Sequence, residues 1–158
     1  MAKRKARQLS AKQKIVREAL QITWVLMGQL KSERMQHLRI GGMLAEMRDR
    51  NLYKELHHAD MGDYGEKRLK LGRTCLYQYL NVYDWVKTSH PGWLKKGTKS
   101  FIPDISDMTD LMRIEEELKR KNLKAEDRKQ LESLLKKGLN GELRQSQLKE
   151  LRKKIKRV

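Results

Sequence analysis

The residues with the most informative chemistry lie at positions 73–89, where apolar side chains recur at the three- and four-residue spacing of an α-helix. The opposite side of that helix carries guanidinium, hydroxyl and amide groups. Such groups can read base edges in the major groove, where Arg chelates guanine and Gln or Asn pairs with adenine. The candidates for base contacts are Arg73, Thr74, Tyr77, Gln78 and Asn81. An ordinary amphipathic surface helix would show the same periodicity, so that alternative stays open.

The preceding segment supplies the elements that would position this helix. Residues 61–69 predict a short helix with Asp60 as its N-cap, and Lys70-Leu71-Gly72 predicts a tight turn. A short helix, a tight turn and a longer helix with a polar outer face are the layout of a helix-turn-helix. We therefore predict a helix-turn-helix at about residues 60–89, with its recognition helix at 73–89.

The charge of the chain favours a polyanionic partner. The 158 residues include 37 Lys and Arg against 20 Asp and Glu, a net charge of +17. Residues 1–14 hold six bases and no acid, and residues 110–158 hold sixteen bases and nine acids, whereas residues 51–90 are nearly neutral. Basic ends suit nucleic acid; the alternative, which stays open, is a solubilising tail or a basic helix face that meets only water. The candidates for phosphate contacts are Lys3, Arg4, Lys5, Arg7, Lys70, Lys149, Arg152, Lys153, Lys154, Lys156 and Arg157.

Residues 40–83 resemble a bacterial helix-turn-helix family whose members occur on plasmids, phages and integrative elements. The stretches that carry the resemblance are IGGMLAEMRDRNLYKEL at 40–56, MGDY at 61–64 and LKLGRTCLYQYL at 69–80. The resemblance implies that Met61 and Tyr64 anchor the first helix, and that four of the base-contact candidates occupy recognition-helix positions: Arg73, Thr74, Tyr77 and Gln78.

The sequence departs from the family in the turn and just before the first helix. Lys70 replaces the usual turn glycine, Gly72 replaces a capping serine, and residues 57–59 replace the usual Gly-Tyr. Because glycine is an acceptable N-cap, we expect the turn to survive with altered geometry.

The rest of the chain also predicts helices, and no useful β-alternation occurs. We predict an all-α protein in which a helical domain containing the helix-turn-helix is followed by a C-terminal amphipathic helical hairpin. The expected parts are a basic N-terminal arm at 1–14, a helical domain at 15–90, a loop or linker at 91–109 and a basic helical region at 110–158.

Several single residues have expected places in these elements. Ser10 and Ser32 are the expected N-caps of the first two helices, and Gly138 is an expected C-cap. Trp24 is interpreted as core. Trp85 could pack under the loop at 90–103 or mark where the C-terminal hairpin docks.

No set of residues predicts catalysis or a metal site. His57 and His58 are adjacent, so helical geometry would point them about 100° apart, and we interpret them as a solvent-exposed loop pair. Cys75 is the single cysteine, which excludes a disulfide framework, and it is interpreted as a small core residue. The acids at 115–117 suit the start of a helix and need no catalytic role. The sequence thus predicts neither an enzyme nor a bound cofactor or metal.

The function expected from these features is DNA binding by a cytoplasmic, nucleoid-associated protein of a mobile element. Its role would be that of a regulator, or of a plasmid or phage partition or replication accessory factor. The expected partner is double-stranded DNA, together with a second copy bound through the C-terminal helices. No membrane partner is expected, because the apolar stretch at 22–27 is too short to span a bilayer. No small-molecule substrate is evident from the sequence. The alternative is a non-enzymatic interaction or scaffold protein that binds a partner helix or RNA.

Overall fold

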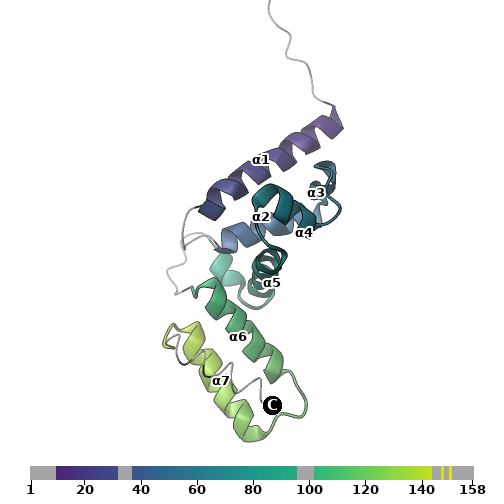
Figure 1. Cartoon of the computed structure of the whole chain (residues 1–158). Coiled ribbons are helices and arrows are strands. Elements are labelled where there is room, and N and C mark those ends of the chain that lie inside the picture. The colour runs from purple at the N-terminus through teal and green to yellow at the C-terminus, as the bar shows by residue number, and fades with distance from the viewer. Residues whose placement is uncertain (1–9, 32–36, 96–101, 144–146, 148–149, 151–158) are drawn as a thin grey trace, which may run out of the picture. The chain divides into compact units, whose positions relative to one another are not determined.

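The computed structural model describes residues 10–31, 37–95, 102–143, 147 and 150, and in these residues the protein is all-helical, as predicted. The helical elements, shown in Figure 1, are α1 (Ala11–Lys31), α2 (His37–Asp49), α3 (Leu52–Glu55), α4 (Met61–Tyr64), the π-helical turn η1 (Gly65–Leu69), α5 (Arg73–Ser89), the 3-10 turn η2 (Pro91–Leu94), α6 (Ile105–Leu118) and α7 (Ala125–Leu139). None of the described helices is both long and apolar enough to cross a membrane. The chain forms two compact units, Met1–Leu80 and Asn81–Val158, and the division falls inside α5.

The start of α1 confirms the predicted cap. The Ser10 hydroxyl accepts from the Gln13 amide at 3.2 Å, and the Gln13 side chain accepts from the Ser10 amide at 2.9 Å. This reciprocal pair satisfies two backbone donors at once. As a result α1 begins at Ala11, so Lys12 and Lys14 of the predicted arm lie in a helix. Residues 1–9 and Ser32 lie outside the described residues.

The core of the first unit forms where α1 packs on α2, α3 and η1. The side chains buried there include Ala19, Leu26, Leu44, Met47, Leu52 and Tyr64. The Thr23 hydroxyl donates to the Ala19 carbonyl at 2.8 Å and lies 2.9 Å from the Tyr64 hydroxyl. Because Thr23 has only one hydroxyl proton, Tyr64 donates to Thr23. This pair satisfies the buried Tyr64 hydroxyl, whose pKa burial raises.

Trp24 was wrongly predicted to be core, because its side chain is 78% exposed. The buried stripe of α1 runs through Ala19, Thr23 and Leu26, and Trp24 lies one residue out of that register. One residue is about 100° around a helix, which turns the indole away from the core.

The two predicted helices around the turn have the expected bounds. α4 and η1 together cover residues 61–69, and α5 covers 73–89. Asp60 caps α4 as predicted, since its Oδ1 accepts from the Asp63 amide at 2.8 Å. At the turn, Lys70 adopts the left-handed conformation, with φ 56°, and the Leu71 amide donates to the Gly65 carbonyl at 3.0 Å.

Gly65 allows these two helices to approach closely. A Cβ added at Gly65 would lie 2.4 Å from Leu76 Cδ1 and 3.2 Å from the Leu71 carbonyl oxygen. Leu76 is fully buried, so the Leu76 side chain has little room to move.

The second unit contains a helical hairpin of α6 and α7 (Figure 1). α6 begins at Ile105, inside the segment 91–109 predicted to be a loop, because Asp104 Oδ1 caps it by accepting from the Asp107 amide at 2.8 Å. Gly138 was wrongly predicted to be a C-cap, since α7 continues to Leu139 and is capped by Asn140. Gly138 is buried, and a Cβ there would lie 2.4 Å from Leu111 Cδ2, so the glycine serves helix packing instead.

An aromatic cluster attaches the segment after α5 to α6. Trp85 Nε1 donates to Glu115 Oε2 at 2.6 Å, and His90 Nε2 lies 3.2 Å from Glu115 Oε1. The His90 ring stacks on Trp93 of η2 with centroids 4.7 Å apart. Trp85 therefore meets both of its expected neighbours, the segment at 90–103 and the C-terminal hairpin.

Gly65→Ala is expected to lower the free energy of unfolding by about 1–3 kcal/mol, because the new methyl group overpacks the contact with Leu76. Gly92→Ala is the control, since no atom lies within 4 Å of a Cβ at that position. Chemical denaturation of the full chain measures both variants. Equal stabilities would contradict the close approach at Gly65.

Candidate nucleic-acid interface

The first turns of α5 are divided as the sequence predicted, whereas on its later turns Val82 and Trp85 are buried outside the predicted stripe. Leu76, Leu80 and Val86 are buried, and Thr74, Tyr77 and Asn81 are exposed on the other side. The Tyr77 side chain is 42% exposed although it is large and aromatic. Gln78 is partly exposed. The exposed side therefore offers hydroxyl and amide groups on successive turns of one helix.

Arg73 is held at the start of α5 by two carboxylates. Its Nη2 lies 3.5 Å from Asp60 Oδ1, and its Nε lies 3.4 Å from Glu66 Oε2. The charge of Asp60 and then the contact with Glu66 raise the pKa of Arg73. To chelate a guanine, the guanidinium would have to exchange these pairs, which are long and solvent-exposed and therefore weak.

The guanidinium of Arg73 also lies over Gly62, where a Cβ would come within 2.8 Å of Cζ. Glycine at position 62 thus makes room for the Arg73 side chain. This arrangement was not predicted from the sequence. The available signal was the acids of the short helix and its cap, which lie seven to thirteen residues before Arg73.

The Asp63 carboxylate contacts His58 in the loop before α4 and Lys67 in the turn η1 that continues the helix. Its Oδ2 lies 2.9 Å from His58 Nδ1, and its Oδ1 lies 2.7 Å from Lys67 Nζ. The hydrogen bonds from Lys67 and then from His58 lower the pKa of Asp63 from 3.8 to about 2.

His58 was wrongly predicted to be solvent-exposed. Its side chain is only 8% exposed, it packs edge-on against Tyr64, and its Nε2 is buried with no hydrogen-bond partner among the described residues. His57 is exposed and has a φ of 63°. Because His57 adopts this left-handed conformation, the side chains of His57 and His58 have different surroundings. Their adjacency in the sequence does not reveal this difference. The described residues contain no group of three or more His, Cys, Asp or Glu able to hold a metal ion.

Of the phosphate-contact candidates, the structure describes Lys70 alone. Lys70 is exposed, forms no ion pair with a described residue, and follows Lys67 and Arg68, which are also exposed. Its left-handed conformation is the one that favours glycine. The remaining candidates lie outside the described residues: Lys3, Arg4, Lys5, Arg7, Lys149, Arg152, Lys153, Lys154, Lys156 and Arg157.

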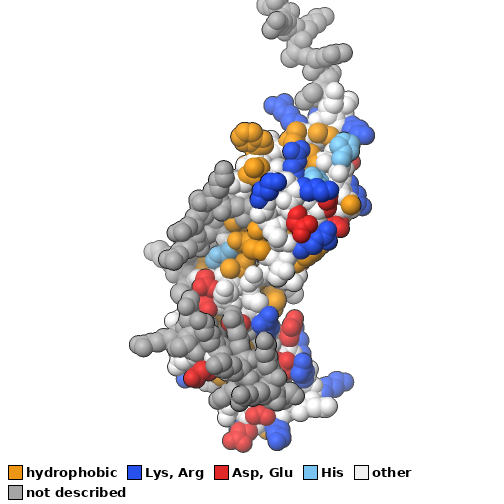
Figure 2. Space-filling view, in the orientation of Figure 1, with side chains coloured by type: hydrophobic (Ala, Val, Ile, Leu, Met, Phe, Trp, Pro, Cys, Tyr) orange, Lys and Arg blue, Asp and Glu red, His pale blue; other side chains and the backbone are white. Residues whose placement is uncertain are grey.

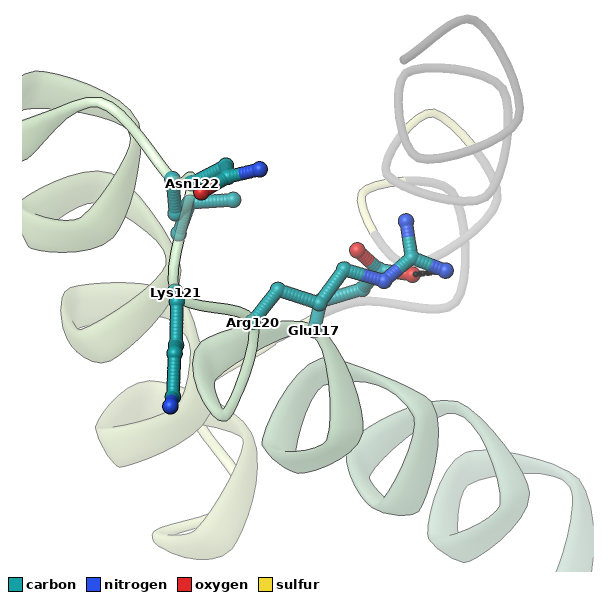
Figure 3. A pocket seen from close by; sticks show the side chains of 5 residues that line it. Glu117, Arg120, Lys121 and Asn122 are labelled. Carbon is teal, nitrogen blue, oxygen red and sulfur yellow. Dashed lines mark ion pairs between the residues drawn. The ribbon is translucent and has the colours of Figure 1, made fainter.

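A cavity of about 410 Å³ lies at the loop between α6 and α7 and is lined by Glu117, Arg120, Lys121, Asn122 and Leu123 (Figure 3). Arg120 Nη2 pairs with Glu117 Oε1 at 2.9 Å, whereas Lys121 extends in a different direction. The lining thus offers one neutralised ion pair and one separate ammonium group. It has no converging charges that would define a ligand.

Cys75 is half-buried in α5, and burial raises the pKa of its thiol. A raised pKa disfavours the thiolate, which is the nucleophilic form. Cys75 was predicted to be a small core residue, but it is only partly buried and lies outside the core.

The lowered pKa of Asp63 predicts a dependence of stability on pH. The pKa of Asp63 is about 2 in the folded state and 3.8 ordinarily. Its stabilising contribution is therefore fully present above the ordinary pKa of 3.8, and it is lost as the pH falls through the folded-state pKa of about 2. We expect wild type to exceed Asp63→Asn in unfolding free energy at neutral pH, with the difference shrinking between about pH 5 and pH 2. Denaturant titrations at several pH values measure it. Glu132→Gln, at an exposed acid of α7, is the control and should show no such convergence; a pH-independent difference for Asp63→Asn would contradict the assignment.

No family model, curated protein or solved structure matches the chain. The resemblance of residues 40–83 to a helix-turn-helix family therefore stays a prediction. The features of the chain that bear on its function are the exposed side of α5, the carboxylates that hold Arg73, and the net charge of +17.

Proposed function

We propose that the protein binds double-stranded DNA through the exposed side of α5, with bases at the two ends of the chain contacting phosphates. The observation that carries the proposal is the pair of helices at 61–69 and 73–89, in which Leu76 and Leu80 are buried while Thr74, Tyr77 and Asn81 are exposed. A helix fixed on one side and polar on the other can enter the major groove.

In this proposal specificity and affinity come from different parts of the chain. Residues 60–78 contain four bases and three acids, too small an excess to bind a polyanion strongly. The exposed side of α5 would read bases, and Lys70 with the terminal bases would supply affinity by releasing counterions from phosphates. The proposed role, which follows from the resemblance, is that of a regulator or a partition or replication accessory factor of a mobile element.

A second copy would extend the footprint in this proposal. Leu131, Leu134 and Leu135 of α7 are only partly buried, which leaves apolar surface for a symmetric contact between C-terminal helices. Light scattering of the full chain at micromolar concentrations should then give twice the monomer mass.

The direct test is selection of bound duplexes from a random pool, followed by footprinting of the enriched sequence. A defined site is expected, and a palindromic one if two copies bind. Retention on heparin without enrichment of any duplex would overturn base reading and favour an interaction or RNA-binding protein.

Asn81→Ala is expected to weaken binding to the selected site by about 1–3 kcal/mol and to relax the preference at one base pair, because the amide is lost from the reading side. Binding to random duplex should change little. Asn122→Ala, an exposed asparagine in the loop between α6 and α7, is the matched control. Lys153→Ala should weaken binding to all sequences alike and flatten the salt dependence. Equal losses on random and selected DNA for Asn81→Ala would contradict base reading by α5.

Lys70→Gly separates the charge of the turn from its geometry. Glycine adopts the left-handed conformation without the penalty of about 1–2 kcal/mol that a side chain incurs, so the variant should be at least as stable as wild type. It should nevertheless bind DNA more weakly, with a smaller salt slope, because one phosphate contact is lost. Lys129→Gln on α7 removes the same charge and should leave binding unchanged. Unchanged DNA binding by Lys70→Gly would remove Lys70 from the interface.

A further inference from the structure

α1 carries a stripe of large apolar side chains that the core does not use. Leu20, Trp24 and Met27 follow one another at i, i+4 and i+7, and they are 38%, 78% and 40% exposed. Figure 2 shows hydrophobic side chains over α1 beside Lys and Arg. An apolar row at this spacing is the pattern by which one helix packs on another.

The exposed stripe is distinct from the stripe that holds α1 in the first unit. The buried positions Ala19, Thr23 and Leu26 are each one residue away from the exposed positions, which is about 100° around the helix. Packing on α2, α3 and η1 therefore leaves the second stripe unpartnered among the described residues. A tryptophan at its centre is typical of a residue that anchors a protein–protein contact.

The charges around the stripe are positive. α1 contains four bases and one acid, and that acid, Glu18, is occupied by two contacts of 2.7 Å from Arg50. Lys12, Lys14 and Arg17 form no ion pair with a described residue. Arg17 lies one turn before Leu20, at the N-terminal end of the stripe, whereas Lys12 and Lys14 lie in the first turn of α1. None of the three is neutralised within the described part of the chain.

This charge selects the occupant. A second copy of α1 would bring the same bases against these bases, and residues 144–158 of the chain are also strongly basic, with seven bases and one acid. Both would be repelled. An amphipathic helix with acidic flanks would match the apolar stripe and the positive charges together.

We propose that Leu20, Trp24 and Met27 form a docking surface for an acidic amphipathic helix of a partner protein. The proposal is independent of DNA binding, because the base-contact candidates lie on α5. The basic side chains of α1 would steer the partner, and Trp24 would supply most of the buried apolar contact.

The test uses the full chain and a synthetic helical peptide of the length of α1, with leucines along one face and glutamates on either side. A second peptide has lysine in place of every glutamate. Calorimetric titration should show binding of the glutamate peptide, weakening with salt, and no binding of the lysine peptide. Trp24→Ala and Met27→Ala should each weaken binding, Trp24→Ala by about tenfold or more.

Val25→Ala is the matched control, because Val25 is as exposed as Met27 but lies outside the stripe. Circular dichroism checks folding, which should be preserved since Trp24 is exposed. DNA binding by Trp24→Ala should equal that of wild type, so failure of either proposal leaves the other standing.

Four outcomes would overturn the docking surface. These are no binding of the glutamate peptide, equal binding of both peptides, unchanged binding by Trp24→Ala, and self-association or association with anionic lipid vesicles that Trp24→Ala abolishes. The last outcome would assign the stripe to a second copy or to a membrane surface instead.

Discussion

The first unit depends on the hydrogen bond between two buried hydroxyl groups, those of Thr23 and Tyr64. The two residues are 41 positions apart, and Tyr64 is completely buried. A buried phenol without a partner would cost free energy, so Tyr64 tolerates this position only where α1 presents Thr23. The contact thereby fixes the short helix at 61–69 on α1, and it is this short helix on which the first turns of α5 pack.

The acids of that short helix explain why the surface beside α5 is nearly neutral. Asp63 binds Lys67 and His58, while Asp60 and Glu66 hold Arg73. Each carboxylate compensates a nearby base and fixes a side chain or a loop. The same neutralisation that orders this surface leaves it with little net charge, so in the proposed function most phosphate contacts depend on bases elsewhere in the chain.

Local signals made the helices predictable, and tertiary packing explains the errors. The bounds of the helices at 61–69 and 73–89 follow from apolar spacing and from an aspartate able to cap its own helix, and both features are readable within a few residues. Trp24 was predicted to be core because it is an aromatic residue in an apolar run. Which residues of α1 are buried depends instead on the side of the helix that faces Tyr64, and Thr23, not Trp24, lies on that side. The burial of His58 requires the left-handed turn at His57, and the role of Gly138 requires Leu111 of another helix. Tyr64 is 40 residues from Trp24, and Leu111 is 27 residues from Gly138, so neither partner is readable from neighbouring residues.

The contrasting surroundings of the tryptophans give the molecule an optical label in each compact unit: Trp24 in the first, and Trp85 with the partly buried Trp93 in the second. Trp24 is largely in water, whereas Trp85 is buried and donates its indole proton to Glu115. An indole in water emits at longer wavelength than one in a packed interior, so emission from the two units differs in colour. Loss of structure in the second unit would shift the emission of Trp85 to the red, while Trp24 already emits there in the folded state. Red-edge and blue-edge emission can thus separate surface events on α1 from unfolding of the helical hairpin without any added dye.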